Sequence, residues 1–324
     1  MKIVCTQPMH HAGLALLEGH QVLVLADEQP RTLYEALAEA DYLVVRSMLP
    51  PDVFEHPNRL RGVVRHGTGL DFIPLERATA HGIAVANVPG ANAQAVVEYC
   101  LSAMLQLRRP LAAMDRMLRS EGWPAARTLA AGCGELRGKT LGVVGLGTIG
   151  SALALACHHG LGMQVLGYQP DERPAPDVVR RVALDALLAG ADVLVLCCPL
   201  TEATRGLVNA ATLARLRRGA ILINAARGPI VVEQDLLAAL RSGHLAGAAL
   251  DVFERQPLQA GHPYLQARGL LLTPHVAGLT EDSTAAMSVG TAQRLLQMIA
   301  GQRPDNLVNP QVWNRPAPQG GHHA

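Results

Sequence analysis

The sequence has almost no net charge, no long hydrophobic run and no cysteine spacing typical of a disulfide scaffold. Its 324 residues carry a formal net charge of +1, which gives no electrostatic case for binding nucleic acid or an acidic membrane surface. No segment approaches the roughly 18 uncharged apolar residues that a membrane helix needs. The first residues, Met1 to Thr6, are typical of a strand, so we expect no signal peptide.

Cysteine and histidine are present, but not in the patterns that hold metal ions. The six cysteines lack a CxxC spacing, which favours reduced thiols in a cytoplasmic protein. Three histidine doublets lack the cysteine, histidine or carboxylate partners of a closed site: His10-His11, His158-His159 and His322-His323. The sequence therefore predicts no metal site.

Hydrophobic residues make up 49% of the chain, enough for two cores, and their pattern alternates between strands and helices. This alternation predicts an α/β protein with two Rossmann-like domains, each a parallel sheet covered by helices. Five strands are expected before residue 140: 3–6, 22–25, 42–46, 62–65 and 83–88. Helices are expected at 11–18, 32–40, 74–80, 93–108 and 284–299, and further strands at 140–144, 164–168, 192–196, 220–224, 247–250 and 270–273. The tail from Gln302 is expected to be loop or disorder.

A glycine-rich loop follows the apolar, β-branched strand 140–144 and precedes a helical segment at 151–156. Strand, glycine turn and helix follow one another in the order of a dinucleotide-binding unit. Gly145 permits the tight turn, Gly147 lets a pyrophosphate approach the backbone, and Gly150 lets the helix pack closely on the strand. The phosphates would then meet the helix N-terminus, where unpaired N–H groups favour negative charge.

The residue expected to hold the adenosine ribose is glutamine. A dinucleotide fold normally places an acidic residue about twenty positions after the glycines, at the end of the second strand, and that position is Gln169. Glutamine can bond to a hydroxyl but does not repel a 2′-phosphate. Asp171 and Glu172 disfavour a phosphate nearby, whereas Arg173 favours one. The cofactor is therefore predicted to be NAD, with NADP not excluded.

An arginine and a histidine follow two further strands of the same unit. Arg227 comes after strand 220–224, and His275 comes after strand 270–273. Ligands bind at the carboxyl ends of strands in such folds. A guanidinium can clamp a carboxylate through two parallel bonds, and an imidazole can deliver a proton near neutral pH. Either residue alone is commonly structural, but their joint placement predicts hydride transfer to a small keto acid.

The chain resembles the D-isomer-specific 2-hydroxyacid dehydrogenase family over nearly its whole length. Five segments carry the resemblance: Gly145 to Gly150, Cys198 to Leu207, Ile223 to Gly228, Ala249 to Phe253 and Thr273 to Gly278. It implies a flavodoxin-like substrate domain built from both chain ends, residues 1–94 plus 281–324, around an inserted dinucleotide-binding domain, residues 95–280. It also implies a homodimer.

The resemblance assigns roles to individual residues. Arg227 would bind the substrate carboxylate, His275 would exchange the proton, and Asp251 would lie beside the nicotinamide. The positions matching the family's cofactor contacts are Gly145, Gly147, Thr148, Ile149, Gly150, Gln169, Cys198, Pro199, Thr204, Ala225, Ala226, Arg227, Asp251, His275 and Gly278.

Gln256 stands where the family places the glutamate that pairs with the catalytic histidine. Glutamine can still orient the imidazole, but it supplies no negative charge to stabilise the imidazolium. We therefore expect a more acidic optimum for keto-acid reduction, or slower reduction at neutral pH. Glu254 lies two residues away and is expected to sit too far along the chain to substitute.

Two loops of the first domain match substrate-contacting positions. The loop Gly67-Thr68-Gly69 matches one whose backbone N–H groups face the substrate carboxylate, and glycine allows the close approach. Arg46-Ser47, after strand 42–46, occupies a region that helps to select the substrate. Two interpretations of Arg46 are equally supported: it binds a second anionic or hydroxyl group of the substrate, or it is a surface residue.

Two alternative functions remain open. The glutamine–histidine pairing also occurs in relatives that oxidise formate with NAD, although the additional substrate motifs of those enzymes are not found. A protein that senses NAD(H) with little turnover is the other alternative, by analogy with the family's corepressors. Gln256 favours it, whereas Arg227 and His275 argue for an enzyme.

Overall fold

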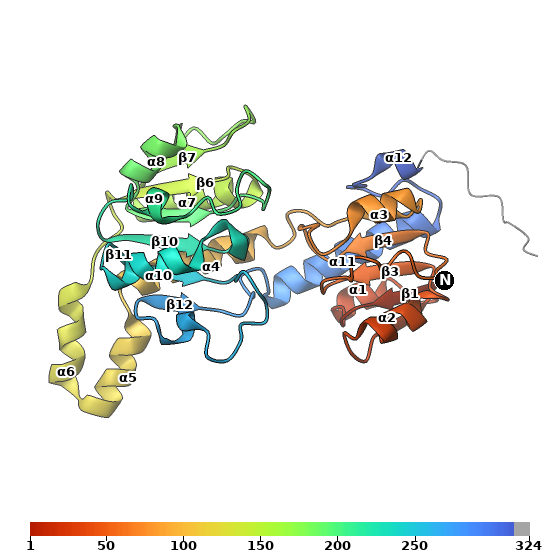
Figure 1. Cartoon of the computed structure of the whole chain (residues 1–324), viewed down its shortest axis with the longest axis horizontal. Coiled ribbons are helices and arrows are strands. Elements are labelled where there is room, and N and C mark those ends of the chain that lie inside the picture. Colours follow the sequence, from red (N-terminus) through yellow and green to blue (C-terminus); the bar gives the residue numbers. More distant parts are fainter. Residues whose placement is uncertain (314–324) are drawn as a thin grey trace, which may run out of the picture. The chain divides into compact units, whose positions relative to one another are not determined.

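The computed structural model describes residues 1–313, and the chain divides into two compact units. Unit 1 contains Met1–Asn92 and Leu279–Ala324, and unit 2 contains Ala93–Gly278. The boundaries expected from the sequence, after residues 94 and 280, each lie two residues from these. The α/β class expected for both units is confirmed (Figure 1).

Unit 1 is built on five parallel strands in the order β2-β1-β3-β4-β5, which is the flavodoxin-like order. All four residues of β3 are buried, as expected for a strand covered on both faces. The strands are β1 (Lys2–Cys5), β2 (Gln21–Val24), β3 (Tyr42–Val45), β4 (Gly62–Arg65) and β5 (Ala84–Ala86).

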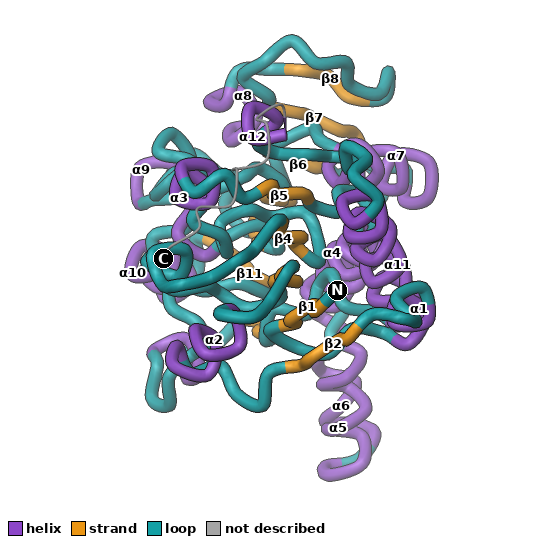
Figure 2. Tube along the Cα trace, turned by 90° about the vertical axis from the view of Figure 1, so that its right-hand side faces the viewer, coloured by secondary structure: helices purple, strands orange, loops and turns teal. Residues whose placement is uncertain are grey.

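Helices cover both faces of the unit 1 sheet (Figure 2). Leu33, Leu37 and Ala78 of α2 and α3 pack into one apolar cluster, and Ala292 and Leu295 of α11 pack into another. The helices are α1 (His11–Ala15), α2 (Pro30–Leu37), α3 (Leu75–Ala80) and α11 (Glu281–Ile299).

Unit 2 is built on seven parallel strands in the order β12-β11-β10-β9-β6-β7-β8. Relative to the first strand of the unit, β6, this is the Rossmann order with one added strand, and the order reverses between β9 and β6. The strands are β6 (Thr140–Val144), β7 (Gln164–Tyr168), β8 (Val179–Arg181), β9 (Val193–Leu196), β10 (Ala220–Asn224), β11 (Leu245–Leu250) and β12 (Leu270–Leu272).

Two helices pack on one face of this sheet and three on the other. Buried residues of α4 and α7 share one cluster with the strands, and those of α8, α9 and α10 share another. The α-helices are α4 (Ala93–Arg108), α7 (Thr148–Leu161), α8 (Leu184–Gly190), α9 (Ala210–Leu213) and α10 (Glu233–Arg241). Short 3₁₀ turns are η1 (Leu129–Gly132), η2 (Gly228–Ile230) and η3 (Pro263–Gln266).

An arm of two helices leaves the body of unit 2, and the sequence pattern did not reveal it. Helices α5 (Leu111–Glu121) and α6 (Trp123–Thr128) contact each other, and no residue of α5 is buried (Figure 1). Leu111, Leu118 and Trp123 are 60%, 43% and 66% exposed.

The described part of the segment from Gln302 is loop as far as Asn309, as expected, and only the short helix over 310–313 departs from that expectation. Leu307 bridges Ala86, and the Asn309 side chain accepts a hydrogen bond from Val85 N–H at 2.8 Å. The same side chain donates to the Ile83 carbonyl, and helix α12 (Pro310–Trp313) follows. The segment is ordered because it satisfies backbone groups along β5, an edge strand. The doublet His322-His323 lies outside the described residues.

Candidate active site

The predicted site residues of unit 2 follow the carboxyl ends of parallel strands, and the strand order sorts them into two groups. The glycine loop and Gln169 follow β6 and β7, whereas Arg227, Asp251 and His275 follow β10, β11 and β12. Strand β9, which ends before Cys197, lies between the groups. An extended dinucleotide fits this edge, with its phosphates at the glycine loop and its reactive ring toward β10–β12.

The three glycines of the β6–α7 loop differ in how much space surrounds them. Gly145 has φ +96°, and a Cβ there would lie 2.8 Å from the Cys197 carbonyl carbon. A Cβ at Gly150 would overlap the Gly145 carbonyl oxygen. Gly147 is different, because its φ of −70° suits any residue and a Cβ there would meet no atom within 4 Å. The fold itself does not require glycine at position 147, and the open space suits a phosphate approaching the backbone.

Gln169 lies against this loop. Its Oε1 accepts a hydrogen bond from Leu146 N–H at 2.6 Å, and its Nε2 donates to Asp171 Oδ1 at 3.1 Å. The neutral amide therefore connects the glycine loop to the turn after β7.

Arg227 is positioned by a turn that the buried side chain of Asn224 organises. The Asn224 amide accepts from Ala226 N–H at 3.1 Å and donates to the Arg227 carbonyl at 2.9 Å. The half-buried Arg227 guanidinium donates to the Ala226 carbonyl at 2.7 Å. Because the Asn224 side chain hydrogen-bonds two backbone groups of the turn, it fixes the position of the Arg227 backbone after β10.

Gly228 brings this turn against the segment that follows β11. A Cβ at Gly228 would overlap the carbonyl group of Phe253 and approach Glu254 N to 2.5 Å. The arginine turn is therefore packed backbone to backbone against the start of the segment that carries Gln256.

His275 lies in a loop that is held by hydrogen bonds to the Asp251 carboxylate. Asp251 is 1% exposed, and it accepts from Thr273 Oγ1 at 2.7 Å and from the N–H groups of Val276 and Ala277 at 2.8 Å each. His275 itself has φ +58°, a left-handed conformation that a non-glycine residue rarely adopts. The buried carboxylate holds the backbone on both sides of this residue and thereby fixes where the imidazole points.

Gln256 and His275 are brought together. His275 Nδ1 lies 2.8 Å from Gln256 Oε1, so the Nδ1–H donates to the amide oxygen and Nε2 is on the opposite side of the ring. The Glu233 carboxylate accepts from the backbone N–H of Glu254 at 3.4 Å and pairs with His262 at 3.1 Å. Gln256 therefore offers His275 a neutral amide oxygen.

The other predicted cofactor residues lie around the same edge. Thr148 is the first residue of α7, followed by Ile149, and Ala225, Ala226 and Gly278 flank the arginine and histidine loops. Pro199 O accepts from Thr204 Oγ1 at 2.7 Å, which closes the loop after β9. Burial raises the pKa of the Cys198 thiol to about 11, so it stays protonated.

The predicted substrate residues belong to unit 1. Thr6 Oγ1 accepts from the N–H groups of Arg46 and Ser47 at 2.8 and 3.2 Å. Partial burial lowers the pKa of Arg46. Arg65 donates to the carbonyls of His66 at 2.8 Å and Gly69 at 3.1 Å, on either side of Gly67-Thr68.

His66 is buried and neutral. It is 3% exposed, and burial first, then the charges of Arg46 and Arg65, lowers its pKa to about 3. Its Nε2 lies 2.8 Å from Ser288 Oγ of α11. The ring therefore connects the loop after β4 to α11 by a hydrogen bond.

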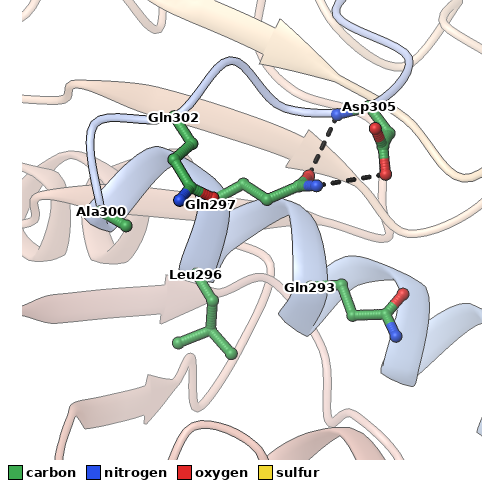
Figure 3. Close-up of a pocket in the computed structure, with 6 residues that line it drawn as sticks. All are labelled: Gln293, Leu296, Gln297, Ala300, Gln302 and Asp305. Carbon is green, nitrogen blue, oxygen red and sulfur yellow. Dashed lines mark hydrogen bonds between the residues drawn. The ribbon is translucent and has the colours of Figure 1, made fainter.

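One cavity lies away from the predicted site residues. A cavity of about 560 Å³ in unit 1 is lined by residues of α11 and the following loop, where Gln297 bonds Asp305 at 3.0 and 3.1 Å (Figure 3). It includes none of the predicted site residues. Among residues 1–313 there is no cluster of three or more side chains able to hold a metal ion, and no helix there is long and apolar enough to span a membrane.

Sequence reasoning missed the residues that position the site. Asn224 and Thr273 were seen only as parts of longer motifs, and Tyr99 and Arg65 were not singled out. Tyr99 lies on α4, and its hydroxyl is 2.8 Å from Thr273 Oγ1, which bonds Asp251. Burial raises the Tyr99 pKa to about 12. Such contacts join residues far apart in the chain, so local pattern carries no signal for them.

Comparison with known proteins agrees with this geometry. Residues 101–277 match the family described as D-isomer specific 2-hydroxyacid dehydrogenase, NAD binding domain. Glyoxylate reductase from Korarchaeum cryptofilum is 33% identical over 96% of this chain and 96% of its own length. D-3-phosphoglycerate dehydrogenase from Archaeoglobus fulgidus is 33% identical over 95% of this chain, which spans only 59% of that relative. The structure of an NAD-dependent formate dehydrogenase from Staphylococcus aureus in complex with NAD is 27% identical, with a TM-score of 0.82, over 92% of this chain and 96% of that chain.

Proposed function

The chain belongs to the D-isomer-specific 2-hydroxyacid dehydrogenase family, and from this premise we propose that it reduces a small 2-keto acid to the D-2-hydroxy acid with NADH. The observation that carries the proposal is the convergence of an arginine turn and a histidine loop at one edge of the unit 2 sheet. The reverse oxidation uses the same groups.

The residues present fit a dinucleotide. Open space above Gly147, the α7 N-terminus beside it and Gln169 against the loop form a cradle for phosphates and ribose. When bound, the nicotinamide supplies or accepts the hydride. The chain's own residues do the remaining work of binding the acid, orienting it and moving the proton.

Two side chains carry that work. Arg227 binds the substrate carboxylate and so determines which face of the keto group receives the hydride. His275 holds its Nδ1 proton toward Gln256, and its Nε2 exchanges a proton with the substrate oxygen. An acid within hydrogen-bond reach is needed because negative charge develops on that oxygen as the hydride arrives.

The substrate contacts of unit 1 are part of the same proposal. The backbone N–H groups of Gly67, Thr68 and Gly69 would receive the carboxylate, with Arg65 holding the carbonyls of the loop. Arg46 and Ser47 would contact the substrate side chain. The name of one relative, glyoxylate reductase, supports a small substrate such as glyoxylate or hydroxypyruvate.

Formate oxidation is the second candidate, and one observation favours it. The histidine partner is the neutral Gln256, and a formate dehydrogenase is among the similar structures. Oxidising formate releases hydride without removing a proton from a hydroxyl, so a charged histidine partner is not needed.

The discriminating experiment measures NADH consumption with glyoxylate, hydroxypyruvate, pyruvate and bulkier 2-keto acids, and NADH formation with formate. We expect keto-acid reduction, lowered about 10²–10⁴-fold in the His275→Gln variant and unchanged in the His81→Gln control, an exposed histidine of unit 1. Activity with formate alone would favour the second candidate. Dinucleotide binding without turnover on any of these would indicate a sensor.

Oligomeric state and location extend the proposal. The apolar surface of the α5–α6 arm, Leu111, Leu118 and Trp123, supports a homodimer in which this arm is covered by a second copy.

All six cysteines are unpaired thiols, which supports a reducing compartment and hence a cytoplasmic location.

A further inference from the structure

We propose that the adenosine end of the dinucleotide site accepts a 2′-phosphorylated cofactor alongside the unphosphorylated one, with Arg181 supplying the positive charge and Gln169 removing the usual repulsion. The proposal rests on the dinucleotide site proposed above and adds its selectivity. It concerns the turn between β7 and β8, at the opposite end of the sheet from Arg227 and His275 (Figure 1).

The first support is the neutral side chain at the strand end. Val144 pairs with Tyr168, so Gln169 emerges beside Gly145 at the carboxyl edge of the sheet. Its amide is held there by Leu146 N–H at 2.6 Å and by Asp171 at 3.1 Å. A carboxylate at this position would bond the ribose 2′-hydroxyl and repel a 2′-phosphate, whereas the amide does not repel it.

The second support is that the nearest carboxylate is already engaged by a cation. Asp171 accepts from Arg173 Nε at 2.8 Å, Nη2 at 2.6 Å and the Arg173 backbone N–H at 3.1 Å. These bonds hold the pKa of the Asp171 carboxyl well below its usual range. The ion pair binds the Asp171 charge to Arg173, so the repulsion of an incoming phosphate is reduced.

The third support is a guanidinium fixed over the turn without a carboxylate partner. Arg181 lies on β8 opposite Gly167, and it donates to the carbonyls of Arg173 at 2.9 Å, Gln169 at 3.3 Å and Asp171. All these bonds are to neutral carbonyl groups, so the positive charge of Arg181 remains uncompensated by contact. A pre-positioned guanidinium is the group that binds phosphate oxygens best.

Other charged side chains of the same segment cancel one another's charge. Glu172, Asp177 and Arg180 are also exposed in this segment, and with them the formal charge of residues 169–181 is zero. Selectivity must therefore come from the positions of Gln169 and Arg181, and not from the net charge of the segment.

The test uses titration calorimetry of the whole protein with 2′,5′-ADP and with ADP, which report binding without turnover. We expect 2′,5′-ADP to bind within about tenfold of ADP, more weakly as salt rises. Arg181→Gln should weaken 2′,5′-ADP at least about fivefold and leave ADP unchanged. The matched control is Arg180→Gln, because Arg180 is an exposed neighbour that makes no hydrogen bond to the turn, and it should change neither.

A second variant keeps the test independent of how well Arg181→Gln folds. Gln169→Glu adds the repelling charge and leaves Arg181 in place, so it should weaken 2′,5′-ADP at least about tenfold relative to ADP. The proposal is overturned if the native protein binds ADP but not 2′,5′-ADP, or if Gln169→Glu and Arg181→Gln weaken both ligands equally. Failure to bind either ligand would instead remove the dinucleotide site itself.

Discussion

Gln256 is the residue whose side chain lies beside His275, the proposed proton donor, and it carries no charge. Its amide oxygen lies 2.8 Å from His275 Nδ1, so Gln256 orients the ring without supplying a negative charge of its own. The Glu233 carboxylate does not take this role, because it pairs with His262 at 3.1 Å.

We predict that Gln256→Glu extends keto-acid reduction to higher pH. A carboxylate favours the protonated imidazole, and we expect the descending limb of kcat/KM to move up by about one pH unit, a modest shift because the site is exposed. The measurement is a pH–rate profile, with Gln259→Glu in the same exposed loop as the control. An unchanged profile in the Gln256 variant would show that the pairing does not govern protonation.

We predict that His66 makes the protein less stable in acid. The unfolded chain protonates this histidine near pH 6.5, whereas burial delays protonation in the folded protein to about pH 3. The contribution of His66 to stability is therefore complete above pH 6.5 and declines as the pH falls toward 3, at about 1.4 kcal/mol per pH unit in the steepest part.

Denaturant unfolding at several pH values measures this slope. His66→Gln should flatten the dependence between pH 6.5 and 3, because glutamine does not titrate. The exposed His81→Gln is the control and should leave the slope as it is in the native protein. Equal slopes in all three proteins would mean that His66 has the same pKa in the folded protein as in the unfolded chain.

At the scale of elements, the β6–α7 loop contains two glycines that the fold requires and one, Gly147, that it does not. Gly145 and Gly150 are required by neighbouring backbone, whereas Gly147 has open space and an ordinary φ. Because this open position lies in the loop before α7, it leaves room for a group that approaches the backbone from outside.

We predict that Gly147→Ala folds as well as the native protein but binds NADH at least about tenfold more weakly. The added methyl group meets no protein atom within 4 Å, yet it enters the space proposed for the pyrophosphate. Gly160→Ala on α7 is the control, since it also meets nothing and should raise stability by about 0.5–1 kcal/mol. Thermal melts and fluorescence titration with NADH measure both effects; unchanged affinity in Gly147→Ala would place the phosphates elsewhere.

Element boundaries were predictable where local signals are strong. Strands β6, β7 and β10 and helix α4 have the predicted bounds, because continuous buried apolar runs and an apolar helix face are visible locally. Helix α11 begins three residues earlier than predicted, at Glu281, where Thr280 and Ser283 form a capping box. The α5–α6 arm was not predicted, although Leu111, Met114 and Leu118 recur at helical spacing in α5; what the sequence could not show is that this apolar face is left exposed.

For the whole molecule, the exposed apolar residues of the arm have a testable consequence. We predict that the protein is a dimer and that Trp123→Asp combined with Leu111→Asp halves its mass in solution, because charges then replace exposed apolar side chains that the proposed dimer would bury. Light scattering after size exclusion measures the mass. Leu265→Asp, an equally apolar position that is 54% exposed on η3, is the control and should remain a dimer. A monomeric native protein would contradict the prediction.

From the sequence alone came the two α/β units, the order of the chemical residues after their strands, and the dinucleotide loop. These follow from hydrophobic periodicity and turn chemistry, which act between residues close in the chain. Only the tertiary structure showed that Asn224 builds the arginine turn, that Asp251 grips the histidine loop, and that Arg173 and Arg181 surround the turn after Gln169. Those contacts join separate strands and loops, and their geometry exists only once the sheet has brought the strand ends together.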